Sequence, residues 1–138
     1  MSPKIIQVKI AHLQQVLLDL KPHIHASQEK QMQTHYEIER QVQLAVDLAV
    51  DAGRRWLLIN KHPVPNNARE VFIALENKKL IPKGLAKKLA DATGLRNILV
   101  HEYDDLDYNL FFGGLKKGFH AFVKFTAAVV RGLNTKKT

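Results

Sequence analysis

Arg96, Asn97, His101 and Tyr103 bring a guanidinium, an amide, an imidazole and a phenol together within eight residues. Histidine is the side chain whose ordinary pKa lies closest to neutrality, so it can move protons at physiological pH. Arginine is a permanently charged, forked donor, which suits a phosphate that gains negative charge in a transition state. RNA cleaved by attack of its own 2′-hydroxyl needs neither a metal nor a protein nucleophile. The segment is therefore a candidate site for RNA phosphodiester cleavage.

The spacing of these residues decides how they meet. On an ideal helix Asn97 and His101 lie one turn apart on one face, where the amide can orient the imidazole. Arg96 is five residues from His101, about 140° around the helix. The two converge on one phosphate if the helix ends near His101, or if two copies of the segment meet across a dimer axis. An isolated Arg–His pair is more often only a structural hydrogen bond, and that alternative stays open.

The elements that carry this segment are predicted to be helices. Apolar residues recur at three- and four-residue steps nearly everywhere, which indicates an all-α protein of four to six helices. Pro22 is expected to interrupt or end the first helix, and the polar stretch 21–33 to be a connection or a solvated extension. Further helices are expected over 34–59, 68–77, from a first turn containing Pro82 to about residue 100, and over 107–133.

The last two expected helices carry further predictions. Four acids within 102–107 should end one helix and cap the next. Gly113–Gly114 predicts a kink or a break. Trp56 is assigned to the core. The inward side of the last helix is expected to consist of Leu110, Phe119, Phe122, Val123, Thr126 and Val130.

Composition places the chain among ordinary globular proteins, and its charge points to anionic partners. The 138 residues suit one domain, 1–138, with a frayed tail at 134–138. Because the chain has no cysteine, it can form neither a disulfide nor a thiolate metal site, and it suits a reducing cytoplasm. Its first twenty residues are expected to be too polar for a signal peptide or a membrane span. The net charge is +8; residues 71–138 hold twelve bases and six acids, whereas residues 1–70 hold nine and seven. A basic half attracts phosphates.

Several residues have a plain structural interpretation beside the functional one. Tyr103 is equally explained as a buried aromatic at a helix end. His101 with the nearby aspartates matches no standard metal-ligand spacing, so no metal is expected. The other histidines considered, His12, His23, His25 and His35, are expected at the surface. Five lysines form either a solvated face or a phosphate-binding surface: Lys78, Lys79, Lys83, Lys87 and Lys88.

Residues 94–103 resemble the signature of HepT-type toxins in the HEPN superfamily, R-x-x-x-x-H-x-Y, including the polar residue after the arginine. The run 39–51 resembles that family's second helix, and 80–90 resembles the start of its motif helix. The resemblance extends over about residues 35–133.

This resemblance implies a HEPN-type bundle of about five helices that homodimerises, with both motifs in one basic cleft. It implies a cytoplasmic toxin: a metal-independent endoribonuclease without a cofactor, in which Arg96 and His101 carry catalysis and Asn97 supports them. It also implies an MntA-type minimal nucleotidyltransferase antitoxin that transfers AMP to Tyr103. Two alternatives remain, namely a non-catalytic HEPN module that binds a nucleotide or supports a nucleotidyltransferase, and a structural dimer with a decayed site.

Overall fold

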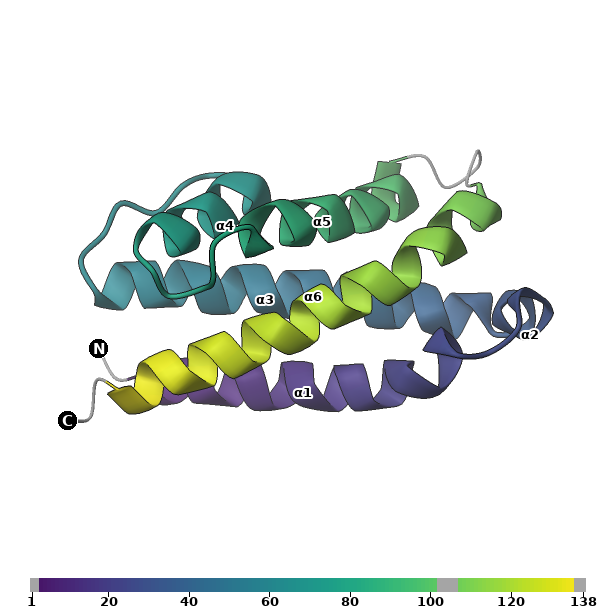
Figure 1. Cartoon of the computed structure of the whole chain (residues 1–138), viewed down its shortest axis with the longest axis horizontal. Helices are drawn as coiled ribbons and strands as arrows, with labels where there is room; N and C mark the ends of the chain where they lie inside the picture. Colours follow the sequence, from purple (N-terminus) through teal and green to yellow (C-terminus); the bar gives the residue numbers. More distant parts are fainter. Residues whose placement is uncertain (1–2, 102–106, 136–138) are drawn as a thin grey trace.

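A computed structural model of the chain describes residues 3–101 and 107–135, and within these ranges all side chains except those of Ile98, Val100, His101 and Thr135. The described residues form helices and connecting loops without a strand (Figure 1). The helices are α1 (Lys4–Ile24), α2 (Gln28–Gln33), α3 (His35–Ile59), α4 (Ala68–Asn77), α5 (Leu85–His101) and α6 (Tyr108–Thr135).

The four longer helices form a bundle in which α3 and α5 run in opposite directions (Figure 1). The start of α3, the end of α5 and the start of α6 therefore lie at the same end of the molecule, which we call the motif end. α1 packs on α3 and α6, and α5 packs on α4 and α6. This arrangement fixes the motif helix α5 between two partners.

The core consists of two clusters of buried side chains. The larger one joins α1, α3, α4, α5 and α6 and includes Trp56, as predicted. The smaller one lies toward the motif end, where Leu99 of α5 packs with Phe111, Phe112 and Leu115 of α6. Burying a leucine or phenylalanine side chain contributes about 1.5–3 kcal/mol. Leu99 thus anchors the last turns of α5 to α6 just before the motif histidine.

The polar stretch 21–33 is more structured than predicted. α1 continues through Pro22 to Ile24, and 28–33 form the short helix α2. Ser27 begins α2 because its Oγ accepts a hydrogen bond from Lys30 N at 3.2 Å. The buried residue of α2 is Gln31, whose Nε2 donates to His23 O at 2.8 Å. A buried glutamine leaves no apolar periodicity, which is why the sequence pattern missed this helix.

α5 and α6 also differ in detail from the predictions. Pro82 lies in the turn before α5 rather than in its first helical turn. Of the kink or break predicted at Gly113–Gly114, the break is wrong, because α6 is continuous through both glycines. A Cβ at Gly114 would lie 3.2 Å from Leu95 Cδ2, so glycine there allows α5 and α6 to approach closely. The predicted cap before α6 is confirmed for Asp107, whose Oδ1 accepts from Leu110 N at 3.2 Å. The other three acids lie outside the described residues.

The inward side of α6 was predicted only in part. Phe122 and Thr126 are buried, whereas the predicted inward residues Leu110, Val123 and Val130 are exposed by 62%, 40% and 37%. The buried stripe runs instead at three- and four-residue steps from the start of the helix, along Phe111, Leu115, Gly118, Phe122, Phe125 and Val129. α6 is apolar around much of its circumference, so periodicity alone left its register open.

Two lysines occupy backbone positions that favour glycine. Lys61 follows α3 with φ 60°, and Lys79 follows α4 with φ 63°. Both belong to Schellman-type helix ends, in which His62 N donates to Leu57 O and Leu80 N donates to Leu75 O. A left-handed conformation costs a non-glycine residue about 1–2 kcal/mol.

No helix among the described residues is long and apolar enough to cross a bilayer.

Candidate active site

Arg96 is held by two side chains. Its Nη1 donates to Asp47 Oδ1 on α3 at 2.7 Å, and its Nε donates to Asn97 Oδ1 at 3.1 Å. The Arg96 side chain is 26% exposed and that of Asp47 is 50% exposed. These two bonds use Nε and Nη1 and leave the N–H groups of Nη2 for another acceptor. The arginine is therefore oriented while keeping donors for a phosphate.

Asn97 accepts a hydrogen bond from Arg96 through its amide oxygen. Its predicted role in orienting the imidazole of His101 involves a side chain outside the described residues and stays a prediction. α5 continues as a helix to His101, its last residue, so the backbone positions of Arg96 and His101 remain about 140° apart around the helix axis. The side chain of His101 and the whole of Tyr103 lie outside the described part of the chain.

A cleft of about 660 Å³ lies beside Arg96, lined by α3, α5 and the segment that begins α4. Arg54 and Arg69 line it together with Arg96, Asp47 and Asp51. Arg54 is fixed because its Nη2 donates to Asn66 O at 2.7 Å. The cleft thus combines basic groups that can meet phosphate with a carboxylate, that of Asp47, which holds Arg96 in place.

Asp51 keeps its charge within this cleft. Burial raises the pKa of Asp51. Hydrogen bonds from Arg55 and Lys9 and their positive charges lower this pKa by more than burial raises it, so that it lies below the ordinary value. Arg55 Nε lies 3.1 Å and Lys9 Nζ 3.2 Å from Asp51 Oδ2. Asp51 therefore remains a carboxylate and cannot serve as a proton donor near neutral pH.

Asp47 and Arg54 were not singled out by the sequence. They lie seven residues apart, and therefore on one face of α3. Asp47 is 49 residues from Arg96, and no local pattern links the two. The signal that could have indicated Asp47 and Arg54 is their helical spacing, which places polar side chains on one face of α3 where another helix can pack.

A second polar cluster lies at the motif end. Glu39 is buried, and its Oε2 lies 2.5 Å from His35 Nδ1 and accepts from Tyr108 Oη at 3.3 Å. The cluster joins the first turn of α3 to the first turn of α6. His35, predicted to be at the surface, is half-buried because it packs against Tyr108, and His23 is half-buried beside Thr34 and Glu37. His12 and His25 are exposed, as expected.

Neither polar cluster suggests a metal centre. Among the residues that the structure describes, no group of three or more His, Cys, Asp or Glu side chains is arranged to hold a metal ion. Of the combination of His101 with Asp104, Asp105 and Asp107, which the spacing did not favour as a metal site, only Asp107 has a described side chain. The five lysines predicted as a solvated face, Lys78, Lys79, Lys83, Lys87 and Lys88, are all exposed.

Comparison with known proteins gives two sequence relatives. A tRNA nuclease HepT from Aphanizomenon flos-aquae is 40% identical over 74 residues, and an mRNA nuclease HepT from Shewanella oneidensis is 29% identical over 88 residues. The matched segments cover 54% and 64% of this chain, and 50% and 63% of those relatives. The chain thus spans about half to two-thirds of the length of the curated relatives it matches.

Solved structures share the fold. A tri-AMPylated HEPN toxin of Shewanella oneidensis in complex with an MNT antitoxin has a TM-score of 0.81 at 23% identity, covering 95% of this chain and 99% of that chain. The cytosolic protein of unknown function YutE from Bacillus subtilis has a TM-score of 0.85 at 15% identity, covering 99% and 93%. At these identities the likeness establishes the HEPN helical fold. The family model described as "Ribonuclease HepT-like" matches residues 8–129, and the chain therefore belongs to the HepT-like ribonuclease family.

Proposed function

We propose that this protein is a metal-independent endoribonuclease toxin whose site is built from Arg96 and His101. The observation that carries the proposal is the guanidinium of Arg96, oriented by Asp47 and Asn97 with N–H groups left for an acceptor, on the same helix as His101. The nuclease names of the two sequence relatives support RNA as the substrate.

The proposed reaction uses the RNA's own nucleophile. His101 accepts the proton of the 2′-hydroxyl, whose oxygen attacks the adjacent phosphorus, and the bond from phosphorus to the 5′-oxygen breaks. The leaving oxygen takes a proton, and the products are a 2′,3′-cyclic phosphate and a 5′-hydroxyl end. Arg96 stabilises the negative charge that gathers on the phosphoryl oxygens. Asn97 acts as a positioning residue because it holds Arg96.

A homodimer completes the proposed site. Arg96 and His101 diverge by about 140° around α5, which makes it difficult for one helix to aim both at one phosphate. A two-fold axis near the end of α5 would bring Arg96 of one copy toward His101 of the other. Closed two-fold dimers are also the commonest oligomers of soluble proteins. We therefore propose that both motifs face one cleft.

The proposed control of the toxin is AMP transfer to Tyr103 by an MntA-type nucleotidyltransferase antitoxin in the cytoplasm. The similar Shewanella toxin of known structure is AMPylated and bound to an MNT antitoxin, which supports this partner. An AMP ester adds an anionic phosphodiester two residues beyond His101. That charge can pair with Arg96 and repel incoming RNA.

The test is digestion of RNA by purified, unmodified protein in the presence of EDTA. We expect cleavage with cyclic phosphate or its opened product at the new 3′ ends. RNA whose 2′-hydroxyls are methylated serves as the control, because it lacks the nucleophile and should stay intact. Cleavage that requires an added divalent ion, or that proceeds equally on the methylated RNA, would contradict the mechanism. Nucleotide binding without any cleavage would favour the non-catalytic HEPN module instead.

A further inference from the structure

The helices α5 and α6, together with the loop that precedes α5, carry an unusual distribution of charge. α6 contains four lysines and arginines and no acidic residue over its 28 residues. Residues 77–90, which lead into and begin α5, contain five lysines and no acid. Soluble protein surfaces normally intersperse both signs. The two acid-free segments belong to neighbouring elements, since α5 packs directly on α6.

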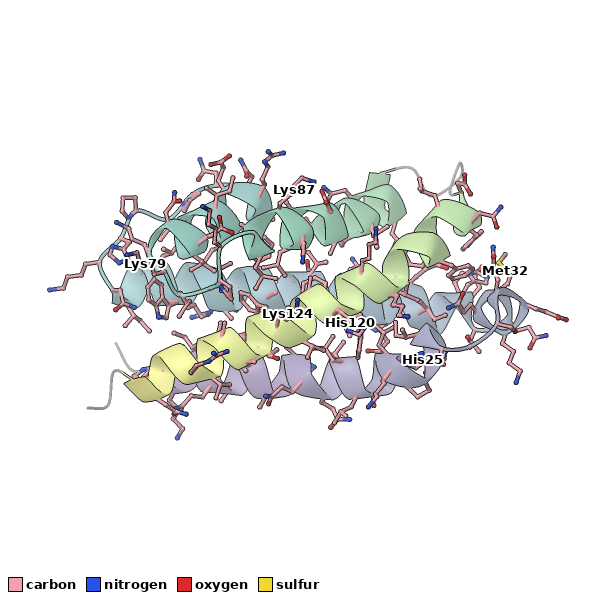
Figure 2. All side chains as sticks on the ribbon, viewed as in Figure 1. His25, Met32, Lys79, Lys87, His120 and Lys124 are labelled. Atoms are coloured by element: carbon pink, nitrogen blue, oxygen red, sulfur yellow. The ribbon has the colours of Figure 1, made fainter. Side chains whose placement is uncertain are left out.

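Two cavities lie along the exposed sides of these two segments. The first, near the middle of α6, has a volume of about 440 Å³ and is lined by Lys88, Lys117, Lys124 and His120 together with small and apolar residues. Farther along α6 a cavity of about 830 Å³ follows, lined by the loop 78–83 and by Arg131. Figure 2 shows Lys79 at the end of the molecule opposite the motif end, and Lys124 and His120 partway along α6. We call the two cavities together the basic groove.

The acids near the basic groove are already engaged. Asp91 lines the first cavity and pairs with Lys87 at 3.3 Å. Glu76 lines the second, and its Oε1 accepts a hydrogen bond from Ala86 N at 2.9 Å. Among the described residues, Lys88, Lys117 and Lys124 are exposed and take part in no ion pair. The groove therefore carries a net positive charge, with Lys88 on its α5 side and Lys117 and Lys124 on its α6 side.

The length and direction of the groove fit a polynucleotide. Its α6 side runs from Gly114 to Gly132, about 27 Å at 1.5 Å per residue. That distance spans roughly eight phosphates at the spacing of a nucleic-acid strand. At its Gly114 end the groove is lined by Leu95, the neighbour of Arg96. A second copy of this chain seated on the same face would set lysines against lysines, and such like-charge contacts cost several kcal/mol.

We propose that the basic groove between α5 and α6 binds the phosphate backbone of RNA and leads the strand to the motif end. This inference rests on the proposed ribonuclease function for the identity of the polyanion. Lys88, Lys117 and Lys124 neutralise phosphates next to the motif, and the loop 78–83 with Arg131 extends the contact. Because these groups meet backbone phosphates, the groove contributes affinity without base specificity.

The test measures binding apart from cleavage. The probe is a fluorescent, unstructured 2′-O-methyl RNA of about twenty nucleotides, longer than the groove and without the nucleophile. Lys117→Gln/Lys124→Gln is compared with the matched double variant Lys21→Gln/Lys30→Gln, which removes two exposed lysines from α1 and α2. At about 0.15 M salt the groove variant should bind roughly tenfold more weakly, and the slope of log K against log salt should fall by roughly 1.4. The control variant should change affinity less than about twofold.

Several outcomes would contradict parts of this proposal. Equal weakening by both double variants would mean that only net charge matters. A groove variant that binds the probe like the parent but no longer binds the nucleotidyltransferase would assign the groove to an acidic protein. A groove variant with a changed oligomeric state by light scattering would make this face an interface between copies. A parent protein that binds the probe through the groove yet leaves ordinary RNA intact would refute the ribonuclease while the groove stands.

Discussion

Arg96 and Asp47 are 49 residues apart in the sequence, and their side chains meet at 2.7 Å between α5 and α3. The ion pair engages Nη1 and Asn97 engages Nε, so the N–H groups of Nη2 are left for other acceptors. An arginine at a helix surface otherwise samples many rotamers, and ordering it costs free energy that substrate binding would have to supply. Asp47 removes part of that cost before RNA arrives.

Asp47→Asn tests this role. The variant keeps an oxygen acceptor but loses the charge, so we expect the guanidinium to be held less firmly and kcat for RNA cleavage to fall by about tenfold or more. The free energy of unfolding should change by less than about 1 kcal/mol, since the pair is partly exposed and solvent screens it. Asp19→Asn, at an exposed site on α1, is the control and should leave kcat unchanged. An Asp47→Asn enzyme with the parent's kcat would remove Asp47 from the positioning scheme.

Mixing two inactive variants tests the shared cleft. Arg96→Ala and His101→Ala should each be inactive as homodimers. If Arg96 of one copy acts with His101 of the other, a mixed dimer contains one intact site, and co-refolded protein should regain about a quarter of the parent's sites for a random mixture. The measurement is RNA cleavage in EDTA, with light scattering to establish the dimer. No recovery from confirmed mixed dimers, or full activity in a monomer, would rule out the composite site.

Tyr103→Phe separates regulation from catalysis. The phenol is not the proposed acid or base, so the variant should cleave RNA like the parent but resist silencing by the nucleotidyltransferase. Intact-mass measurement after co-expression should show one AMP or a small multiple of it on the parent and none on the variant. A modified and silenced variant would place the AMP elsewhere. An unmodified but inactive variant would make Tyr103 part of the catalytic machinery.

The left-handed lysines predict a gain in stability. Lys79→Gly removes a conformational cost at φ 63° and should raise the free energy of unfolding by about 1 kcal/mol, or a few degrees in Tm. The neighbour Lys78 has φ −88° and gains nothing from glycine, so Lys78→Gly should lower stability instead. Thermal unfolding followed by circular dichroism checks both. Equal losses in the two variants would show that the left-handed backbone at Lys79 carries no strain.

The sequence predicted best where local signals were strong. The bounds of α3 and α4 agree with the expected helices to within a residue, because apolar periodicity and the break at Pro63 and Pro65 define them. The positions of Gln31 and His35 were not predicted, because each is a polar side chain drawn out of solvent by a partner. Gln31 is buried and bonded to His23 O, and His35 is half-buried beside Glu39. The role of Asp47 was not predicted for a different reason, since it depends on the packing of α3 against α5.

The motif also shows the limit of local reasoning. The resemblance identified the family, and the continuous helix to His101 confirms the backbone spacing on which the dimer argument rests. Asn97 was predicted to orient His101, whereas its contact with the neighbouring Arg96, whose Nε donates to its amide oxygen at 3.1 Å, was not predicted. Which of two acceptable partners a side chain takes depends on rotamers, and residue spacing does not determine those.

The most direct measurement of the central claim is the initial rate at which His101→Ala cleaves RNA in EDTA, compared with the parent at equal concentration. His12→Ala, an exposed histidine on α1, is the matched control, and circular dichroism should show the same helical content in all three proteins. Loss of the proton-transfer group should reduce the rate by about a hundredfold or more, while His12→Ala keeps the parent's rate. If His101→Ala cleaves RNA as fast as the parent, His101 is not the catalytic base and the proposed mechanism is wrong.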